Sequence, residues 1–194
     1  MHPVLRLIAV FGLSLLMGLG SAWYMIGTGS AFTTGRIGPW NVWYSAGNPN
    51  ADPYTRAHFA RSGRLPITST SALYYEAKID SEGDALTADC EYVIEGQPLD
   101  AGWWSLALYE ASGRLIPNKA DRHAFSNRDL AFRTDGSYQI VLARTARPGN
   151  WLPTGDGGKI KLVLRVYVPR GSNSLVRGRL LDARLPEILR LDCQ

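Results

Sequence analysis

The most regular alternation of apolar and polar residues in the chain lies in residues 159–168, KIKLVLRVYV. Apolar side chains, among them Leu162 and Leu164, occupy every second position. Lys161 and Arg165 belong to the alternate set of positions. Successive side chains of a β-strand point to opposite faces, so the pattern predicts a strand with one face on a core and the other in water. Strands of this kind are typical of antiparallel sheets.

The same period of two recurs on both sides of this strand. Turn-forming pairs such as Ser112-Gly113 and Asp135-Gly136 separate the alternating segments. A series of short strands with such turns predicts a mainly β domain, folded as an antiparallel β-sandwich or a jelly roll. The expected inward residues are Leu73, Tyr75, Ala77 and Ile79, then Cys90, Tyr92 and Ile94, then Trp104, Leu106 and Leu108, then Tyr138, Ile140 and Leu142, and finally Leu189, Leu191 and Cys193.

One short helix is expected before the strands. Asp52 can accept hydrogen bonds from the free N–H groups of a first helical turn, and Pro53 suits the first helical position. Gly63 can end the helix. The sequence therefore predicts a β-rich domain at residues 51–194 that begins with this helix, and residues 28–50 are expected to form a tether.

Residues 1–27 are predicted to be a signal anchor. Residues 7–26 are twenty positions without a charge, and a helix of that length spans about 30 Å, the thickness of a bilayer core. The alternative is a cleaved signal peptide, because the small residues 20–22 resemble a cleavage site.

Both alternatives place residues 28–194 outside the cytoplasm. Arg6 precedes the apolar run, which favours a cytoplasmic N-terminus and a single-pass protein of the bacterial inner membrane with its C-terminal domain in the periplasm. Cys90 and Cys193 are the only cysteines. An oxidising compartment would favour a disulfide between them.

Composition indicates a folded domain with a basic C-terminal half. The chain is 45% hydrophobic and carries a net charge of +4. Residues 28–110 hold five basic and ten acidic side chains, and residues 111–194 hold fifteen basic and seven acidic ones. A basic surface can meet phosphate, anionic glycans or lipid headgroups. The basic residues are scattered without a run of five, so a nucleic-acid partner is not expected.

The sequence contains no strong catalytic, metal-binding or cofactor-binding motif. His58 and His123 have no paired-ligand spacing, and no G-x-S-x-G sequence is present. The glycine-rich run 155–158 lacks the Lys-Ser/Thr of a phosphate-binding loop and precedes a strand, so it predicts a hairpin turn. We therefore expect no catalytic residues, no metal and no cofactor.

Aromatic residues in the expected loops are the first candidates for ligand binding. Trp40, Trp43 and Trp151 could stack on sugar rings or on another apolar ligand. The alternative is that they cover the ends of the sandwich or seal the tether onto it.

Four stretches, taken in their order along the chain, are distinctive. They are 104–109 (WSLALY), 113–118 (GRLIPN), 150–153 (NWLP) and 162–167 (LVLRVY). Together they resemble the bacterial domain of unknown function 1214, and the segment of Asp52, Pro53, Tyr54 and Arg56 resembles what precedes this domain in short, membrane-anchored members. The resemblance implies a β-rich, jelly-roll-like domain and carries no settled reaction.

These observations favour a non-catalytic binding or interaction module at the membrane, with a glycan, a lipid or an envelope protein as its partner. The alternative is a periplasmic hydrolase or glycan-modifying enzyme with a site at the loop end of the sandwich. The candidate ligand-binding residues are Trp40, Trp43, Arg56, Asn150 and Trp151.

Overall fold

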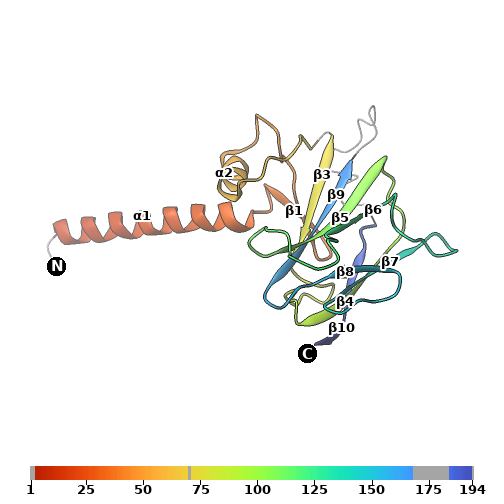
Figure 1. Ribbon diagram of the computed structural model, residues 1–194. Helices are drawn as coiled ribbons and strands as arrows, with labels where there is room; N and C mark the ends of the chain where they lie inside the picture. The colour runs from red at the N-terminus through yellow and green to blue at the C-terminus, as the bar shows by residue number, and fades with distance from the viewer. Residues whose placement is uncertain (1–2, 70, 168–183, 194) are drawn as a thin grey trace.

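The computed structural model describes residues 3–69, 71–167 and 184–193, and it is mainly β, with two sheets and two helices in those ranges (Figure 1). The six-stranded sheet has the order β1 (Thr34–Ile37), β2 (Trp40–Trp43), β3 (Ala72–Ala77), β9 (Ile160–Tyr167), β5 (Trp103–Glu110) and β6 (Ala124–Ser126). The four-stranded sheet has the order β10 (Glu187–Cys193), β4 (Cys90–Gly96), β7 (Tyr138–Ala143) and β8 (Asn150–Pro153). The helices are α1 (Pro3–Thr28) and α2 (Pro53–Ser62).

The inward faces of the two sheets share one hydrophobic core, as the alternation predicted. Leu162 and Leu164 of β9 have no exposed surface. Trp104 of β5 and Tyr138 of β7 bring the two sheets into contact, with ring centroids 5.0 Å apart. The predicted sandwich is therefore confirmed, and β9 lies at its centre, between β3 and β5.

One strand pair departs from the antiparallel pattern. β8 runs parallel to β7, with Ile140 opposite Asn150 and Ala143 opposite Pro153. A parallel neighbour usually requires a long crossover. Here the connection has to return only from Ala143 to the level of Ile140, about 10 Å at the rise of a strand, so residues 144–149 suffice.

The structure assigns residues 34–43 to the six-stranded sheet, although they were expected to belong to the tether. β1 and β2 form a hairpin, and β2 pairs with β3. Trp40 and Val42 face the core and are each 1% exposed. A positive φ at Gly38 makes the tight turn between the strands. Burial of these two side chains is what draws the segment into the domain.

The short helix α2 begins and ends as predicted. The Asp52 carboxylate accepts hydrogen bonds from the N–H groups of Tyr54 and Thr55, and Gly63 ends α2 in the left-handed conformation. None of the residues described in α1 is buried, and the helix is long and apolar enough to cross a membrane.

The inward side of β10 differs from the prediction by one residue. Ile188 is fully buried, whereas Leu189 and Leu191 are exposed, so the expected inward positions of those two leucines were wrong. Arg190 follows Ile188 on the inward side, where it lies 2.8 Å from the buried carboxylate of Asp80. That ion pair makes a polar residue acceptable in the inward row, which the sequence pattern could not anticipate.

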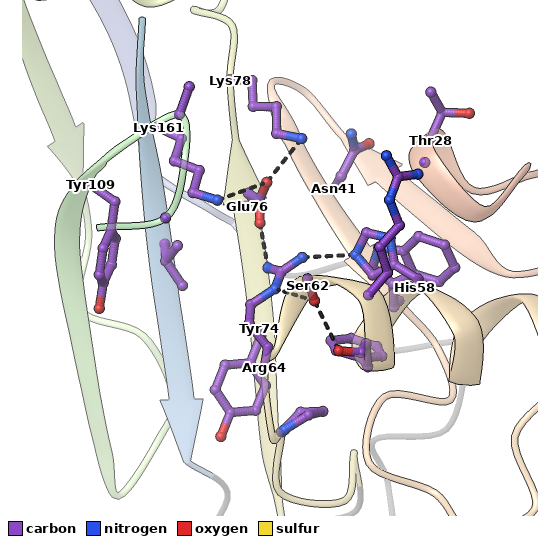
Figure 2. Close-up of a pocket in the computed structure, with 18 of the residues that line it drawn as sticks. Thr28, Asn41, His58, Ser62, Arg64, Tyr74, Glu76, Lys78, Tyr109 and Lys161 are labelled. Carbon is purple, nitrogen blue, oxygen red and sulfur yellow. Dashed lines mark hydrogen bonds and ion pairs between the residues drawn. The ribbon is translucent and has the colours of Figure 1, made fainter. Parts of the chain in front are cut away.

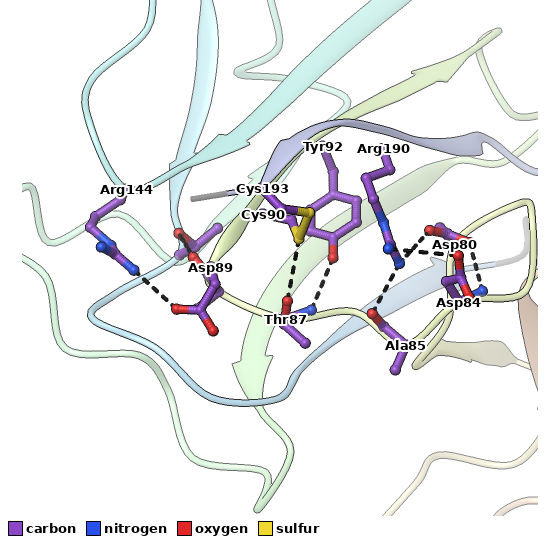
Figure 3. Close-up of a disulfide and its surroundings, with 12 residues drawn as sticks. Asp80, Asp84, Ala85, Thr87, Asp89, Cys90, Tyr92, Arg144, Arg190 and Cys193 are labelled. Carbon is purple, nitrogen blue, oxygen red and sulfur yellow. Dashed lines mark hydrogen bonds and ion pairs between the residues drawn. A yellow bond between two sulfur atoms is a disulfide. The ribbon is translucent and has the colours of Figure 1, made fainter.

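The predicted disulfide between Cys90 and Cys193 is present (Figure 3). Arg190 pairs with Tyr92, and Cys193 then pairs with Cys90, so β10 contains one extra residue between the two pairs. This β-bulge brings Cys193, which is out of step with Ile188, opposite its partner. The bond ties the last described residues to the four-stranded sheet.

We expect loss of this bond to destabilise the protein strongly. The cysteines are 103 residues apart, and the chain-entropy model assigns about 4.7 kcal/mol to a loop of that size. Thermal unfolding of the full chain in detergent should therefore begin at a lower temperature after reduction. The double variant Cys90→Ser, Cys193→Ser should unfold at that lower temperature whether or not reductant is present. An unchanged melting temperature after complete reduction would contradict the expectation.

Candidate functional site

A pocket of about 910 Å³ lies on the outer face of the six-stranded sheet, beneath α2 and the last turn of α1 (Figure 2). We call it the sheet-face pocket. Its floor is formed by outward residues of β2, β3, β5 and β9, and its wall by α2, by the segment after α2 and by the end of α1. Its lining includes Ile26, Gly27, Thr28, Trp43, His58, Arg61, Arg64, Leu65, Tyr74, Glu76, Lys78, Tyr109, Lys161 and Arg165.

Strand alternation places the polar floor residues. Inward positions of β3 and β9 fill the core, so the positions between them point to the other face of the sheet. Antiparallel pairing then sets Tyr74 opposite Arg165, and Tyr109 opposite Lys161. The polar side of a half-exposed sheet was expected to face water, but α2 covers part of it and turns it into a pocket.

Three cationic side chains of the pocket pair with the carboxylate of Glu76. Its carboxylate lies 2.5 Å from Arg64, 3.1 Å from Lys78 and 3.9 Å from Lys161, and its side chain is 15% exposed. Burial raises the pKa of Glu76, but the three neighbouring cations outweigh that effect and hold the pKa below its usual value. Glu76 is therefore ionised at neutral pH.

Positive charge exceeds negative charge in the pocket. The described lining residues include five cationic side chains and one carboxylate, that of Glu76. Lys161 is nearly buried, and this burial lowers its pKa below the usual value, with Glu76 opposing the shift. Arg165 donates a hydrogen bond to the hydroxyl oxygen of Tyr109 and lies over the Tyr109 ring. The pocket therefore carries positive charge that the Glu76 carboxylate does not neutralise.

His58 connects the end of α1 to this charge cluster. Its Nδ1 lies 2.7 Å from the carbonyl oxygen of Ile26, which can only accept, so Nδ1 carries the hydrogen. Its Nε2 then accepts a hydrogen bond from Arg64 at 2.7 Å. The Trp43 ring stacks on the imidazole at a centroid distance of 4.1 Å. Burial lowers the pKa of His58, the hydrogen bond to Ile26 opposes this shift, and the charge of Arg64 adds to it, so the imidazole is neutral at neutral pH.

The hydrogen bonds of His58 and Ser62 occupy the groups that could act as a base or a nucleophile. The acceptor nitrogen of His58 is occupied by Arg64, so it activates no nucleophile in this conformation. Ser62 accepts a hydrogen bond from Arg64 and donates one to the carbonyl oxygen of Phe59. Among the described ranges 3–69, 71–167 and 184–193, no group of three His, Cys, Asp or Glu side chains could hold a metal ion.

The five predicted ligand-binding residues do not come together. Trp43 lines the sheet-face pocket. Trp40 is a core residue whose indole N–H donates to the carbonyl oxygen of Pro186 at 2.7 Å, which leaves no surface for a ligand. Arg56 is exposed on α2 outside the pocket, and Asn150 and Trp151 belong to the other sheet.

Asn150 and Trp151 fasten β8 to its surroundings. The buried amide of Asn150 accepts from the N–H of Ala131 and donates to the carbonyl oxygens of Ala131 and Gln139. The half-buried Trp151 indole donates to the carbonyl oxygen of Ala143 at 2.9 Å. For Trp151, this contact agrees with the packing role that the sequence left open as the alternative to ligand binding.

Sequence reasoning missed most of the pocket. Glu76, Lys161 and Arg165 were placed on the polar side of their strands, but nothing in the sequence paired β3 with β9. His58 lies within the expected helix and Arg64 directly after it, and neither belongs to a recognisable motif. The one signal that could have pointed to them was the polar face of two strands, combined with a short helix free to cover it.

Comparison with known proteins places the chain in a family. A family model for proteins of unknown function, DUF1214, matches residues 71–171. The chain belongs to this family. The match confirms the resemblance carried by the four stretches, and it includes the floor of the pocket at β3, β5 and β9. His58 and Arg64 precede the matched segment.

Two solved structures are similar to this chain. The VPA0106 protein from Vibrio parahaemolyticus has 21% sequence identity and a TM-score of 0.58, over 74% of this chain and 36% of that chain. An uncharacterized protein from Burkholderia cenocepacia has 22% identity and a TM-score of 0.43, over 64% of this chain and 30% of that chain. The chain thus spans about a third of the length of these proteins, and the first likeness supports the fold. No curated protein matches the sequence.

We expect Trp151→Ala to destabilise the protein. The substitution removes a half-buried ring and the hydrogen bond to Ala143, and losses of this kind cost roughly 1–3 kcal/mol. Urea unfolding of the full chain in detergent should show a lower midpoint. Trp151→Phe keeps most of the ring and loses the hydrogen bond, so its unfolding midpoint should lie between those of the wild type and Trp151→Ala. A wild-type midpoint for Trp151→Ala would return this residue to the ligand-binding candidates.

The lowered pKa of His58 predicts a loss of stability in mild acid. The unfolded chain takes up a proton near pH 6.5, whereas the folded protein does so only at lower pH. Stability is therefore full above pH 6.5 and is lost as the pH falls through the folded pKa. A protonated imidazole would also present a second N–H to Arg64 in place of an acceptor. The melting temperature should fall by a few degrees between pH 7.5 and 5.5, since a domain of this size loses roughly 2–4 °C for each kcal/mol.

Substitution separates this effect from general acid sensitivity. His58→Gln should remove the part of the pH dependence that belongs to His58, and His123→Gln, which changes a histidine outside the pocket, should keep it. Equal pH dependence in the wild type and both variants would show that His58 does not couple folding to pH.

Proposed function

We propose that this protein is a membrane-anchored, non-catalytic binding module whose sheet-face pocket holds an anionic ligand. The observation that carries the proposal is the charge of the pocket, whose described lining includes five cationic side chains and one carboxylate. Cations grouped in a partly buried space repel one another and lose hydration, so an incoming anion gains more there than at an open surface.

Lys161 and Arg165 are the residues best placed to contact the anion. Lys161 is 8% exposed and lies 3.9 Å from Glu76, which is longer than a hydrogen bond. Its ammonium therefore retains donors for another acceptor. Arg165 presents a planar guanidinium, which suits phosphate and carboxylate oxygens. Arg64 is committed to Glu76 and His58 and acts as the partner that positions both.

The remaining lining residues suit a ligand that also has an apolar or ring-shaped part. Tyr74, Tyr109 and Trp43 offer flat aromatic surfaces. A volume of about 910 Å³ lies within the roughly 300–1,000 Å³ of typical small-molecule sites. We therefore favour an organic anion over a bare inorganic one.

The proposed location is the periplasmic face of the bacterial inner membrane. α1 would cross the bilayer once, and Arg6 favours a cytoplasmic N-terminus. The bond between Cys90 and Cys193 suits an oxidising compartment. If the apolar segment were instead cleaved after residue 22, the pocket-lining residues Ile26, Gly27 and Thr28 would remain with the domain.

A hydrolase or glycan-modifying enzyme has less support. A glycosidase uses two carboxyl groups on opposite sides of the scissile bond, whereas the described lining residues include only Glu76, which is already ion-paired. His58 has no free acceptor for a nucleophile.

Titration of the full chain in detergent with phosphate monoesters and dicarboxylates tests the proposal. We expect saturable binding that weakens with salt, and a Kd about tenfold higher in Lys161→Met, the equivalent of one charge-assisted hydrogen bond. Lys159→Met removes the same charge two positions away, outside the pocket, and should leave the Kd unchanged. Glu76→Gln should lower the Kd, because it removes the competing anion.

The opposite responses of Lys161→Met and Glu76→Gln distinguish a binding site from a structural defect. A defect in folding would weaken binding in both variants. Absence of saturable binding, or equal Kd values in all four proteins, would refute an anion site in this pocket.

A further inference from the structure

The wall of the sheet-face pocket includes the end of the apolar helix. Ile26, Gly27 and Thr28 belong to the last turn of α1 and line the pocket. The uncharged run 7–26 ends at the same turn. Trp23 and Tyr24 lie one turn earlier, and aromatic rings favour the boundary between acyl chains and headgroups. When α1 spans a bilayer, this side of the pocket therefore lies at the depth of the headgroups.

Two contacts hold α2 beside this part of α1. The Arg61 guanidinium lies over the Trp23 ring at 3.9 Å, and His58 donates to the carbonyl oxygen of Ile26 at 2.7 Å. α2 and α1 are in direct contact, as Figure 1 also shows. The pocket is therefore attached to the end of the span and cannot be placed far from the membrane surface.

Exposed apolar side chains lie next to the same end of the helix. Leu65 lines the pocket and is 97% exposed, and Phe32, in the turn after α1, is 85% exposed. Leaving two large apolar side chains in water is unfavourable, whereas the boundary of the acyl chains accommodates them. The pocket thus combines cations inside with apolar groups at its border.

We propose that the ligand of the sheet-face pocket is the phosphate-bearing headgroup of an anionic membrane phospholipid, taken from the leaflet into which α1 inserts. This inference rests on the proposed function and specifies the ligand. The phosphate oxygens would accept hydrogen bonds from Lys161 and Arg165, while the acyl chains extend along the apolar surface of α1, none of whose described residues is buried in the protein. A soluble phosphate ester shares the headgroup chemistry but would make no use of Leu65 or of the α1 wall.

Native mass spectrometry of the full chain released from detergent tests whether the ligand is a membrane lipid or a soluble phosphate ester. The probes are phosphatidylglycerol, phosphatidylcholine and soluble glycerol phosphate. We expect one retained phosphatidylglycerol, about tenfold less phosphatidylcholine because its cationic choline group is repelled by the pocket cations, and about tenfold less phosphatidylglycerol in Lys161→Met. Lys159→Met should retain the lipid as the wild type does.

A second variant separates the lipid from a soluble ligand. Phe32→Ser changes an exposed residue that does not line the pocket, so folding is preserved, and it should reduce retention of phosphatidylglycerol without affecting glycerol phosphate. Equal retention of phosphatidylglycerol by Lys161→Met would show general lipid adhesion and overturn the inference. Saturable glycerol phosphate binding that phosphatidylglycerol does not displace would overturn the lipid source and leave the anion site standing. Absence of binding by every probe would overturn both.

Discussion

The pairing of β9 with β3 and β5 is the constraint on which both faces of the large sheet depend. On the inward face it aligns Leu162 and Leu164 with the core between the sheets. On the outward face it brings Lys161 and Arg165 beside residues of β3 from nearly a hundred positions earlier in the chain. A shift of register by one residue would exchange these faces, exposing the leucines and burying the charges, so the core determines where the pocket cations lie.

Glu76 makes this concentration of cations tolerable. Without its carboxylate, Arg64, Lys78 and Lys161 would repel one another with no counter-charge, which would lower the stability of the folded protein. One carboxylate compensates only part of the charge. The uncompensated positive charge is what the proposed anionic ligand would neutralise, and His58 joins the cluster to the end of α1 through Arg64 and Ile26.

Side-chain alternation was sufficient to predict the β-sandwich, and the capping residues were sufficient to predict the ends of α2, because both signals are local. They failed where a distant partner changed the local preference. Arg190 occupies an inward position because it forms an ion pair there with the buried carboxylate of Asp80. The hairpin 34–43 joins the sheet because the Trp40 side chain packs in the core. The parallel pairing of β8 with β7 likewise depends on the distance that residues 144–149 must span between the two strands, and no local sequence pattern gives that distance.

The sequence by itself determined that this chain has an apolar N-terminal segment, a mainly β domain and two cysteines able to pair, since each follows from composition or from a short-range period. It also set which residues of β3 and β9 are polar. Only the tertiary structure decided that those residues share one pocket, that α2 covers them, and that Asn150 and Trp151 lie on the opposite sheet. The physical reason is that contacts between strands and helices far apart in the chain follow from packing of the whole core, and charge clusters form where that packing leaves space.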